Sequence, residues 1–123
     1  PTPVKIVIIE DHQLVRDMLE FSCRSLVPTA EIYSSENGGN GLTLCRAQQP
    51  DLIFLDLVLP DYDGLELVPE ILAASPTAKL IALTSFADEF TVHRISRAKV
   101  HGFVAKNEQP LDRLKEAIET VLA

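Results

Sequence analysis

The residues best suited to chemistry are polar side chains at the ends of short apolar runs. Glu10 and Asp11 directly follow one such run, and Asp56 ends another. Thr84 and Lys106 end two further runs, nearer the C-terminus. A single carboxylate in such a place often only caps the next helix. Five polar groups in equivalent places instead point to one shared site.

Three carboxylates gathered in one site repel one another unless a cation neutralises them. Oxygen ligands with room left for water suit Mg²⁺, which commonly takes one or two carboxylates and leaves positions for phosphate oxygens. Lys106 adds a positive charge and Thr84 a hydroxyl donor, and both suit a phosphoryl group. The set therefore contains the parts for phosphoryl transfer: an anionic oxygen nucleophile, a metal site, a cation and a hydrogen-bond donor.

The apolar runs themselves recur at regular intervals and are rich in β-branched residues, which favours strands. The first and third are nearly continuous in apolar character, as in strands that are covered on both faces. The runs cover residues 4–9, 30–33, 52–55, 80–83 and 103–105.

The longer segments between these runs have helical spacing. Over residues 13–26, Leu14 and Phe21 belong to a broad apolar face that recurs with the helical period. A second amphipathic helix begins at Leu111. Over residues 36–48 we expect a helix with an irregular beginning, because several glycines stand there and each costs about 1 kcal/mol relative to alanine.

Strands that alternate with helices five times predict an α/β fold, a (βα)5 doubly wound, five-stranded parallel sheet with helices on both faces. Ligands in such folds bind outside the carboxyl ends of the strands. The five polar residues are therefore expected at one edge of the sheet.

Length and composition restrict the class of protein further. The 123 residues fit a single domain over residues 1–123. The formal net charge of −7 argues against binding of nucleic acid or an anionic membrane by this segment. Cys23 and Cys45 lie apart without metal-ligand spacing, which indicates a reducing compartment. Because no apolar run is long enough for secretion or membrane spanning, we expect a cytoplasmic location.

Four sequence blocks together resemble the signature of receiver domains of two-component response regulators. The blocks are residues 4–12 (VKIVIIEDH), 55–64 (LDLVLPDYDG), 83–85 (LTS) and 102–106 (GFVAK). The likeness covers essentially the whole chain. It implies the flavodoxin-like (CheY-like) receiver fold, which agrees with the pattern of strands and helices.

The resemblance also implies roles for individual residues. Asp56 resembles the phosphoacceptor, which takes a phosphoryl group from the phosphohistidine of a sensor histidine kinase. Asp11 looks like a direct Mg²⁺ ligand, with Glu10 acting through or beside a coordinated water. The Asp56 side chain and the backbone carbonyl of Val58 would complete the protein ligands.

The same resemblance implies a route for the signal. Lys106 resembles the residue that pairs with Asp56 and then with the phosphoryl oxygens, and Thr84 resembles the hydroxyl that moves toward them. Phe103 occupies the place of the aromatic switch that turns inward as the threonine moves, although spacing alone equally suits a core aromatic. The readout would lie on the fourth helix, fifth strand and fifth helix, a face on which a homodimer is expected.

Three positions depart from the commonest pattern of the family. Glu10 stands where an aspartate is commoner, and we still expect Mg²⁺ binding. Asn107 follows Lys106 in place of the usual proline, so a cis peptide bond is not expected there. Lys99 stands where a glycine usually ends the fourth helix, which leaves that helix end and the start of the fifth strand open.

Two apolar residues flank the implied phosphoryl site. Val58 and Phe86 stand two residues beyond Asp56 and Thr84, at positions that influence the approach of water in the family. Neither side chain offers a base, so we predict a slow intrinsic loss of the phosphoryl group.

Other polar residues have plainer interpretations. Residues 61–64 (DYDG) imitate a phosphohydrolase motif and the start of a calcium loop, but their context favours a turn in which Gly64 adopts an unusual φ. His12 adjoins the acidic pair and is expected to start a helix more often than to bind a metal. The predicted fourth helix carries a basic strip, interpreted as a solvated face, made of Arg94, Arg97 and Lys99.

The leading interpretation is a phosphorylation-controlled signalling switch that catalyses only its own phosphorylation and dephosphorylation. Its rival is a Mg²⁺-dependent phosphohydrolase with an aspartyl intermediate, which needs a substrate-enclosing cap that 123 residues leave no room for. A flavodoxin-like electron carrier is disfavoured, because the acidic loop after the first strand would repel a flavin phosphate.

Residues 10–16 and 111–118 look most like receivers that precede a LuxR-type helix-turn-helix output domain. The resemblance therefore implies transcription regulation through DNA binding, by an output domain that we expect to be absent from this chain. A stand-alone receiver that acts through protein contacts is the alternative.

Overall fold

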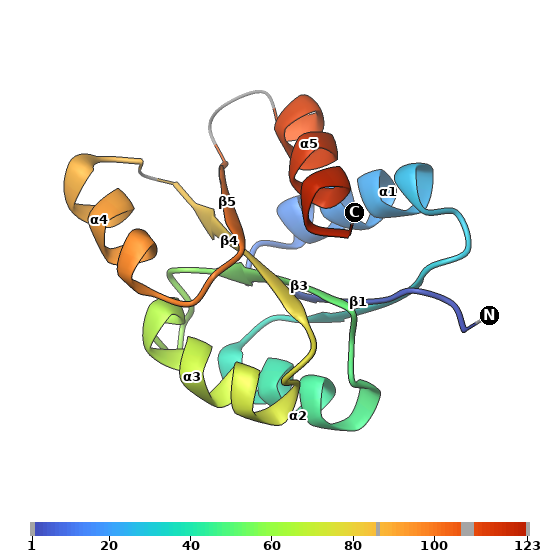
Figure 1. Cartoon of the computed structure of the whole chain (residues 1–123), viewed down its shortest axis with the longest axis horizontal. Helices are drawn as coiled ribbons and strands as arrows, with labels where there is room; N and C mark the ends of the chain where they lie inside the picture. Colours follow the sequence, from blue (N-terminus) through green and yellow to red (C-terminus); the bar gives the residue numbers. More distant parts are fainter. Residues whose placement is uncertain (1, 86, 107–109, 123) are drawn as a thin grey trace.

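The computed structural model describes residues 2–85, 87–106 and 110–122, which form a five-stranded sheet with helices on both faces (Figure 1). All strand pairs are parallel, and the strand order is β2-β1-β3-β4-β5. The predicted doubly wound (βα)5 fold is therefore confirmed. The strands are β1 (Lys5–Ile9), β2 (Glu31–Ser35), β3 (Leu52–Asp56), β4 (Lys79–Thr84) and β5 (Gly102–Ala105). The helices are α1 (Gln13–Leu26), α2 (Gly38–Gln48), α3 (Gly64–Ala74), α4 (Glu89–Arg97) and α5 (Pro110–Leu122).

Side chains of the central strands alternate between two cores, because successive residues of a strand point to opposite faces of the sheet. On β1, Val7 and Ile9 join one core, whereas Ile6 and Ile8 join the other. All four side chains are fully buried. This burial on both faces explains why the strand reads as a continuous apolar run.

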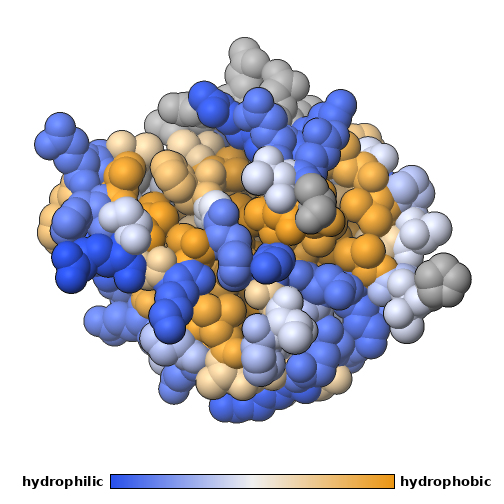
Figure 2. Space-filling model, in the orientation of Figure 1, coloured by the Kyte–Doolittle hydropathy of each residue, from blue (hydrophilic) through white to orange (hydrophobic). Residues whose placement is uncertain are grey.

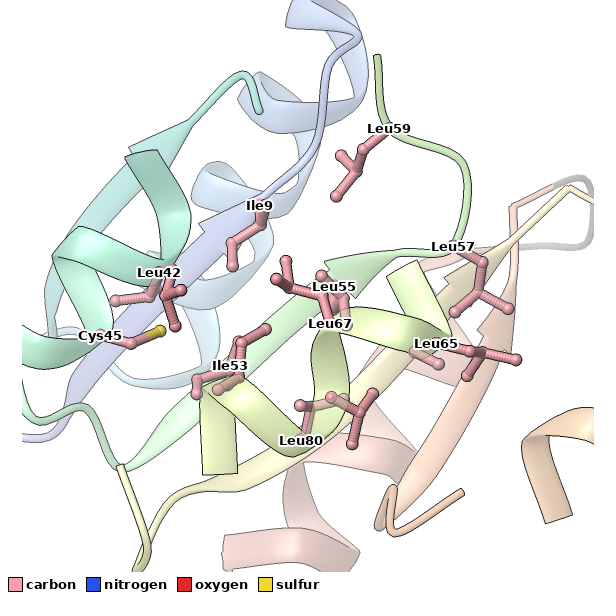
Figure 3. Close-up of a cluster of buried hydrophobic side chains, with 14 of the residues drawn as sticks. Ile9, Leu42, Cys45, Ile53, Leu55, Leu57, Leu59, Leu65, Leu67 and Leu80 are labelled. Atoms are coloured by element: carbon pink, nitrogen blue, oxygen red, sulfur yellow. The ribbon is translucent and has the colours of Figure 1, made fainter. Parts of the chain in front are cut away.

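The first core fills the space between the sheet and the helices α2 and α3, with a further contribution from α4. Figure 3 shows Leu42 and Cys45 of α2 and Leu67 of α3 gathered around Ile53 of β3. The second core lies between the opposite face of the sheet and helices α1 and α5. Each fully buried leucine or isoleucine contributes about 1.5 to 3 kcal/mol, so the two cores together fix the strand ends that carry the polar residues.

Helix α1 has the predicted bounds, but its apolar face is divided. Leu19 and Cys23 lie in the second core. Leu14 and Phe21 are 82% and 69% exposed and form a separate apolar strip that faces solvent. The predicted broad apolar face is therefore only partly used to hold the helix on the sheet.

Helix α2 lacks the predicted irregular beginning and is helical from Gly38. The side-chain oxygen of Asn37 caps it by accepting a hydrogen bond from the backbone N–H of Asn40 at 2.8 Å. A Cβ atom at Gly41 would lie 2.6 Å from Cδ1 of Ile9. Glycine therefore allows α2 to pack closely on β1, and that packing offsets its low helix propensity.

Gly64 begins α3 without the unusual φ predicted for it, since no described glycine has a positive φ. The reason for a glycine is a close approach of two backbones. A Cβ atom at Gly64 would lie 2.3 Å from the carbonyl oxygen of Asp56. The start of α3 therefore presses against the end of β3, next to the polar residues.

The two remaining departures fall on the connections around β5. Helix α4 ends at Arg97, and Lys99 lies in the connection to β5, whose Gly102 pairs with Ile81 of β4. The lysine therefore leaves a regular parallel pairing in place. Asn107 lies outside the described residues, so the peptide bond expected after Lys106 stays a prediction.

Candidate functional site

The carboxyl ends of four neighbouring strands bring the predicted polar residues to one edge of the sheet. Glu10 and Asp11 follow β1, Asp56 ends β3, Thr84 ends β4 and Lys106 follows β5. The four strands are parallel neighbours, so their ends lie side by side. This edge is the place where doubly wound sheets bind ligands.

Lys106 lies between two buried carboxylates. Its Nζ atom is 2.5 Å from Oε1 of Glu10 and 2.8 Å from Oδ2 of Asp56. The side chains of Glu10 and Asp56 are 0% and 4% exposed. One cation cannot balance both carboxylates together with the nearby Asp11, so the cluster requires a proton or another cation.

The pKa values of the cluster reflect this imbalance of charge. Burial, with a smaller contribution from Asp56, raises the pKa of Glu10 to about 8. Burial opposes the charged form of Lys106, but its carboxylate partners outweigh burial and raise the pKa of Lys106. Burial also opposes ionisation of Asp11, yet interactions with Glu10 and Asp56 hold the pKa of Asp11 below its usual value. The raised pKa of Glu10 therefore favours its neutral form when no further cation is bound.

The same carboxylates offer oxygen ligands to a metal ion. Ligand atoms of Glu10, Asp11, His12 and Asp56 all lie within 4.8 Å of one another. Oδ1 of Asp11 is buried and has no hydrogen-bond donor among the described residues, which leaves a position that a cation would satisfy. Carboxylate oxygens are hard ligands, so the residues fit Mg²⁺.

His12 stands at the rim of this cluster. It directly precedes α1, as predicted, and its side chain is 72% exposed. Its Nδ1 atom lies 3.5 Å from Oδ1 of Asp11, so the ring is near the acidic group without being enclosed by it.

The backbone beyond Asp56 folds back over its carboxylate. The Val58 N–H donates to Oδ1 of Asp56 at 3.1 Å, and the Leu57 N–H donates to the Leu83 carbonyl at 3.0 Å. The Val58 side chain is 72% exposed. The backbone of Val58 therefore lies beside the acidic cluster, whereas its side chain is exposed. The metal-binding role of the Val58 carbonyl stays a prediction.

Thr84 and Phe103 lie on the two strands next to the acidic residues. Thr84 is buried, and its carbonyl accepts a hydrogen bond from the Lys106 N–H at 2.7 Å. The Phe103 ring is 42% exposed and lines a groove of about 490 Å³ bordered by α4 and α5. The alternative that Phe103 is a core aromatic is therefore wrong for this conformation. Phe86 lies outside the described residues, so its influence on water stays a prediction.

Arg16 is a site residue that sequence reasoning missed. Its Nη1 atom donates to the carbonyls of Glu10 and Asp11 at 2.8 and 3.1 Å. Arg16 stands one helical turn after His12, a spacing that places both on the same side of α1. That spacing is the signal from which Arg16 could have been found. The two hydrogen bonds of Arg16 hold the loop that carries Glu10 and Asp11.

The aspartates of the loop after β3 serve the starts of helices. Asp61 accepts hydrogen bonds from the N–H groups of Gly38 and Gly39 at 2.8 and 3.0 Å, at the beginning of α2. Asp63 caps α3 by accepting from the Leu65 N–H at 3.0 Å. Carboxylates at helix N-termini are favourable for the helix dipole. The turn interpretation of residues 61–64 therefore holds, with capping roles that the sequence motif did not reveal.

Comparisons with known proteins identify relatives over nearly the whole chain. Residues 6–119 match the response regulator receiver domain family. The transcriptional regulatory protein DegU of Brevibacillus brevis is 30% identical over 119 residues, which cover 96% of this chain and 50% of that protein. The response regulator protein VraR of a Staphylococcus epidermidis strain is 28% identical, covering 89% of this chain and 52% of that protein. The chain therefore spans about half the length of these relatives.

Solved structures agree with this match. The signal receiver domain of a DNA-binding response regulator from Colwellia psychrerythraea has a TM-score of 0.87 and 26% identity, covering 97% of this chain and 98% of that one. A LuxR-family DNA-binding response regulator from Staphylococcus aureus has a TM-score of 0.86 and 25% identity, covering 98% and 99%. Within the described residues, none of the helices has the length and apolar character needed to cross a membrane. The family match, the fold and the strand-end cluster together show that the chain belongs to the response regulator receiver domain family.

Proposed function

We propose that this receiver domain is a phosphorylation-controlled switch in which Asp56 accepts a phosphoryl group from a sensor histidine kinase. The observation that carries the proposal is the environment of the Asp56 carboxylate. It is buried, lies 2.8 Å from the Lys106 ammonium and shares a cluster with Glu10 and Asp11. A carboxylate nucleophile beside a cation and hard oxygen ligands is an arrangement suited to phosphoryl transfer.

In the proposed step, a carboxylate oxygen of Asp56 forms a bond to phosphorus while the bond from phosphorus to the donor's histidine nitrogen breaks. The imidazole leaves, and an acyl phosphate remains on Asp56. The Val58 N–H, at 3.1 Å from Oδ1, orients the carboxylate for this attack. Lys106 then exchanges its contact with the carboxylate for contacts with the phosphoryl oxygens.

Mg²⁺ is the proposed cofactor. Its protein ligands would be the side chains of Asp11 and Asp56 and the backbone carbonyl of Val58, with Glu10 acting through or beside a coordinated water. The set is supported by Oδ1 of Asp11, which is buried and accepts no hydrogen bond from the described residues. The ion supplies positive charge for the oxygens of the transferred group. A cation beside Glu10 would favour its charged form, so binding would be favoured at higher pH.

The proposed readout passes through Thr84 and Phe103. A dianionic group on Asp56 attracts the Thr84 hydroxyl, which lies at the end of the adjacent strand β4. Movement of Thr84 toward it opens space for the half-exposed ring of Phe103, which turns inward. Phosphorylation therefore changes the face formed by α4, β5 and α5, on which we propose that the homodimer forms.

The chemistry of the chain is then limited to its own phosphorylation and dephosphorylation. Val58, next to the acceptor, is apolar and offers no base to an attacking water. We therefore propose a slow intrinsic loss of the phosphoryl group. The free thiols of Cys23 and Cys45 are compatible with a proposed cytoplasmic location.

Two kinds of partner follow from this function. The sensor kinase must contact the receiver beside Asp56, and the exposed Leu14 near the start of α1 offers it apolar surface. The output is proposed to be transcription regulation, by a DNA-binding domain that lies outside these 123 residues. The two curated relatives described above support this output, since one is named a transcriptional regulatory protein and the other a response regulator.

Incubation with Mg²⁺ and acetyl phosphate, followed by intact-mass measurement, tests the proposal. The expected result is one added phosphoryl group that requires Mg²⁺, is removed by hydroxylamine and is absent in Asp56→Asn. The absence of any Mg²⁺-dependent adduct contradicts the proposal, as does an adduct that persists in Asp56→Asn. Rapid turnover of a small phosphate ester would instead favour the phosphohydrolase.

A further inference from the structure

A groove of about 680 Å³ runs between α3 and α4, away from the acidic cluster. Its apolar lining comes mainly from α3, where Leu65 and Val68 are buried at the base of the groove, Leu72 is partly exposed and Pro69 is exposed. On the face seen in Figure 2, apolar surface is visible between α4 and α3 with hydrophilic side chains at its borders. The groove therefore combines an apolar floor with a polar rim.

The groove exists because α4 is weakly held on the fold. Among its nine described residues only Ile95 is buried, and Phe90 is 72% exposed. A helix held mainly by one buried side chain and by the ion pair of Arg94 with Asp63 leaves part of the surface of its neighbour uncovered. The space beside α3 is consequently open to another molecule.

The rim of the groove is basic although the whole chain carries a net charge of −7. It is lined by His93, Arg94, Arg97 and Lys99. Arg94 is paired with Asp63, but Arg97 and Lys99 have no ion-pair partner among the described residues. Glu66 is the acidic residue of the lining. The groove thus keeps unpaired positive charge next to exposed apolar surface.

We propose that the α3–α4 groove is a docking site for an acidic amphipathic helix of a partner protein. Apolar side chains on one face of that helix cover Pro69 and Leu72, and its acidic side chains pair with Arg97 and Lys99. Charge complementarity selects an acidic partner, because opposite charges across an interface favour the correct partner and repel basic competitors.

Two other occupants fit the groove less well. A second copy of this chain would present a different face to the groove, and such a head-to-tail contact continues into an open chain of molecules unless it closes into a ring. A membrane of anionic lipids offers negative charge, but a flat bilayer surface cannot enter a groove between two helices. A helix is both convex and able to carry apolar and acidic faces.

The groove is separate from the proposed phosphoacceptor, so its test needs no phosphorylation. A displayed library of helical, amphipathic 18-residue peptides is selected against the intact chain, with Glu and Lys equally frequent at the polar positions. We expect selected peptides to be enriched in Glu and to shift backbone NMR signals of α3 and α4. Reversing the rim charge in R97E/K99E weakens binding about tenfold or more.

Matched variants separate the groove from general electrostatics. R24E/K115E makes the same change of net charge at exposed residues of α1 and α5 and should leave binding within about twofold. R97Q/K99Q, which places no acid at the end of α4, should weaken binding less than R97E/K99E. R97E/K99E should in turn select Lys-rich peptides.

Four outcomes overturn the proposal: no peptide above background, no enrichment of Glu, equal binding to R97E/K99E, or NMR shifts confined to another face. Binding of phosphatidylglycerol vesicles through Arg97 and Lys99, without peptide binding, would assign the groove to lipid. Concentration-dependent self-association abolished by R97E/K99E would assign it to a second copy. Each of these two results also contradicts the peptide proposal.

Discussion

Arg94 of α4 forms an ion pair with Asp63, with Nη2 lying 2.8 Å from Oδ2. Asp63 also caps α3, seven residues along the chain from Asp56. The pair therefore connects α4 to the loop that follows the proposed phosphoacceptor. It supplies a contact for α4, a helix that otherwise has one buried residue.

Changes at Asp63 should separate its capping role from its ion pair. Asp63→Ala loses both and should lower the free energy of unfolding by about 1 to 2 kcal/mol. Asp63→Asn keeps a good cap and loses only the charge, so it should cost about 0.5 kcal/mol. Urea unfolding measures both, with Arg94→Gln as the control for the pair. Equal losses for the two Asp63 variants would contradict the capping role.

Gly64 should not tolerate a side chain, because a Cβ atom there would lie 2.3 Å from the Asp56 carbonyl oxygen. Gly64→Ala should lower the free energy of unfolding by about 2 kcal/mol or more. Gly39 is the matched control, since its Cβ would lie 3.5 Å from the nearest atom, Oδ2 of Asp61. Gly39→Ala should be neutral or stabilise the protein by up to about 1 kcal/mol. Thermal unfolding of the two variants measures both effects. A Gly64→Ala variant as stable as the wild type would show that the two backbones approach less closely than described.

His101 should make stability depend on pH. Its Nδ1 atom accepts a hydrogen bond from the Leu80 N–H at 3.0 Å, which requires the neutral ring. Burial, and to a smaller extent Lys79, lowers the pKa of His101 below its ordinary value of 6.5. As the pH falls, the unfolded chain takes up this proton first, so the stabilising contribution is complete above pH 6.5 and is lost toward the lower folded pKa.

The matching experiment compares unfolding of the wild type and His101→Asn at pH 7.5 and 5.5. Asparagine offers an acceptor near the position of Nδ1 and does not titrate, so this variant should lose less stability between the two pH values. His93→Asn, on the exposed side of α4, should behave as the wild type does. The same pH dependence in wild type and His101→Asn would remove His101 from the explanation.

Glu10→Gln should separate the needs of folding from those of metal binding. Because burial raises the pKa of Glu10 to about 8, the carboxyl is largely neutral at pH 7, and glutamine is close to it in shape. Without Mg²⁺ the substitution should change the free energy of unfolding by no more than about 1 kcal/mol. It should weaken Mg²⁺ binding about tenfold, measured by calorimetry, because a negative charge beside the ion is lost. Unchanged Mg²⁺ affinity would exclude Glu10 from the metal site.

Much of the fold could be predicted from the sequence because its signals are strong and local. β1 and β3 are buried on both faces of the sheet, so their sequences are continuous apolar runs. Residues that end parallel strands must meet at one edge of the sheet, so the strand pattern alone predicts that Asp56 and Lys106 lie together.

The rest depends on contacts between segments that spacing does not encode. Helical periodicity identifies an apolar face on α1, but not that Leu14 and Phe21 would face solvent while Leu19 is buried. The capping of α2 by Asp61 joins parts of the chain that are distant in sequence. The hydrogen bond that the exposed His101 accepts from the Leu80 N–H likewise has no sequence pattern that would reveal it.

The central claim is that Asp56 becomes an acyl phosphate, and reductive trapping tests it most directly. The intact chain is treated with acetyl phosphate and Mg²⁺ and then with borohydride, which reduces an aspartyl phosphate to homoserine. Peptide mass spectrometry then locates the change. We predict homoserine at position 56 only when both acetyl phosphate and Mg²⁺ were present before the borohydride step. The aspartates at positions 11, 61 and 63 should remain unchanged. Unmodified aspartate at position 56 in protein that has gained a phosphoryl group, or a phosphoryl group located on His12, would contradict the account.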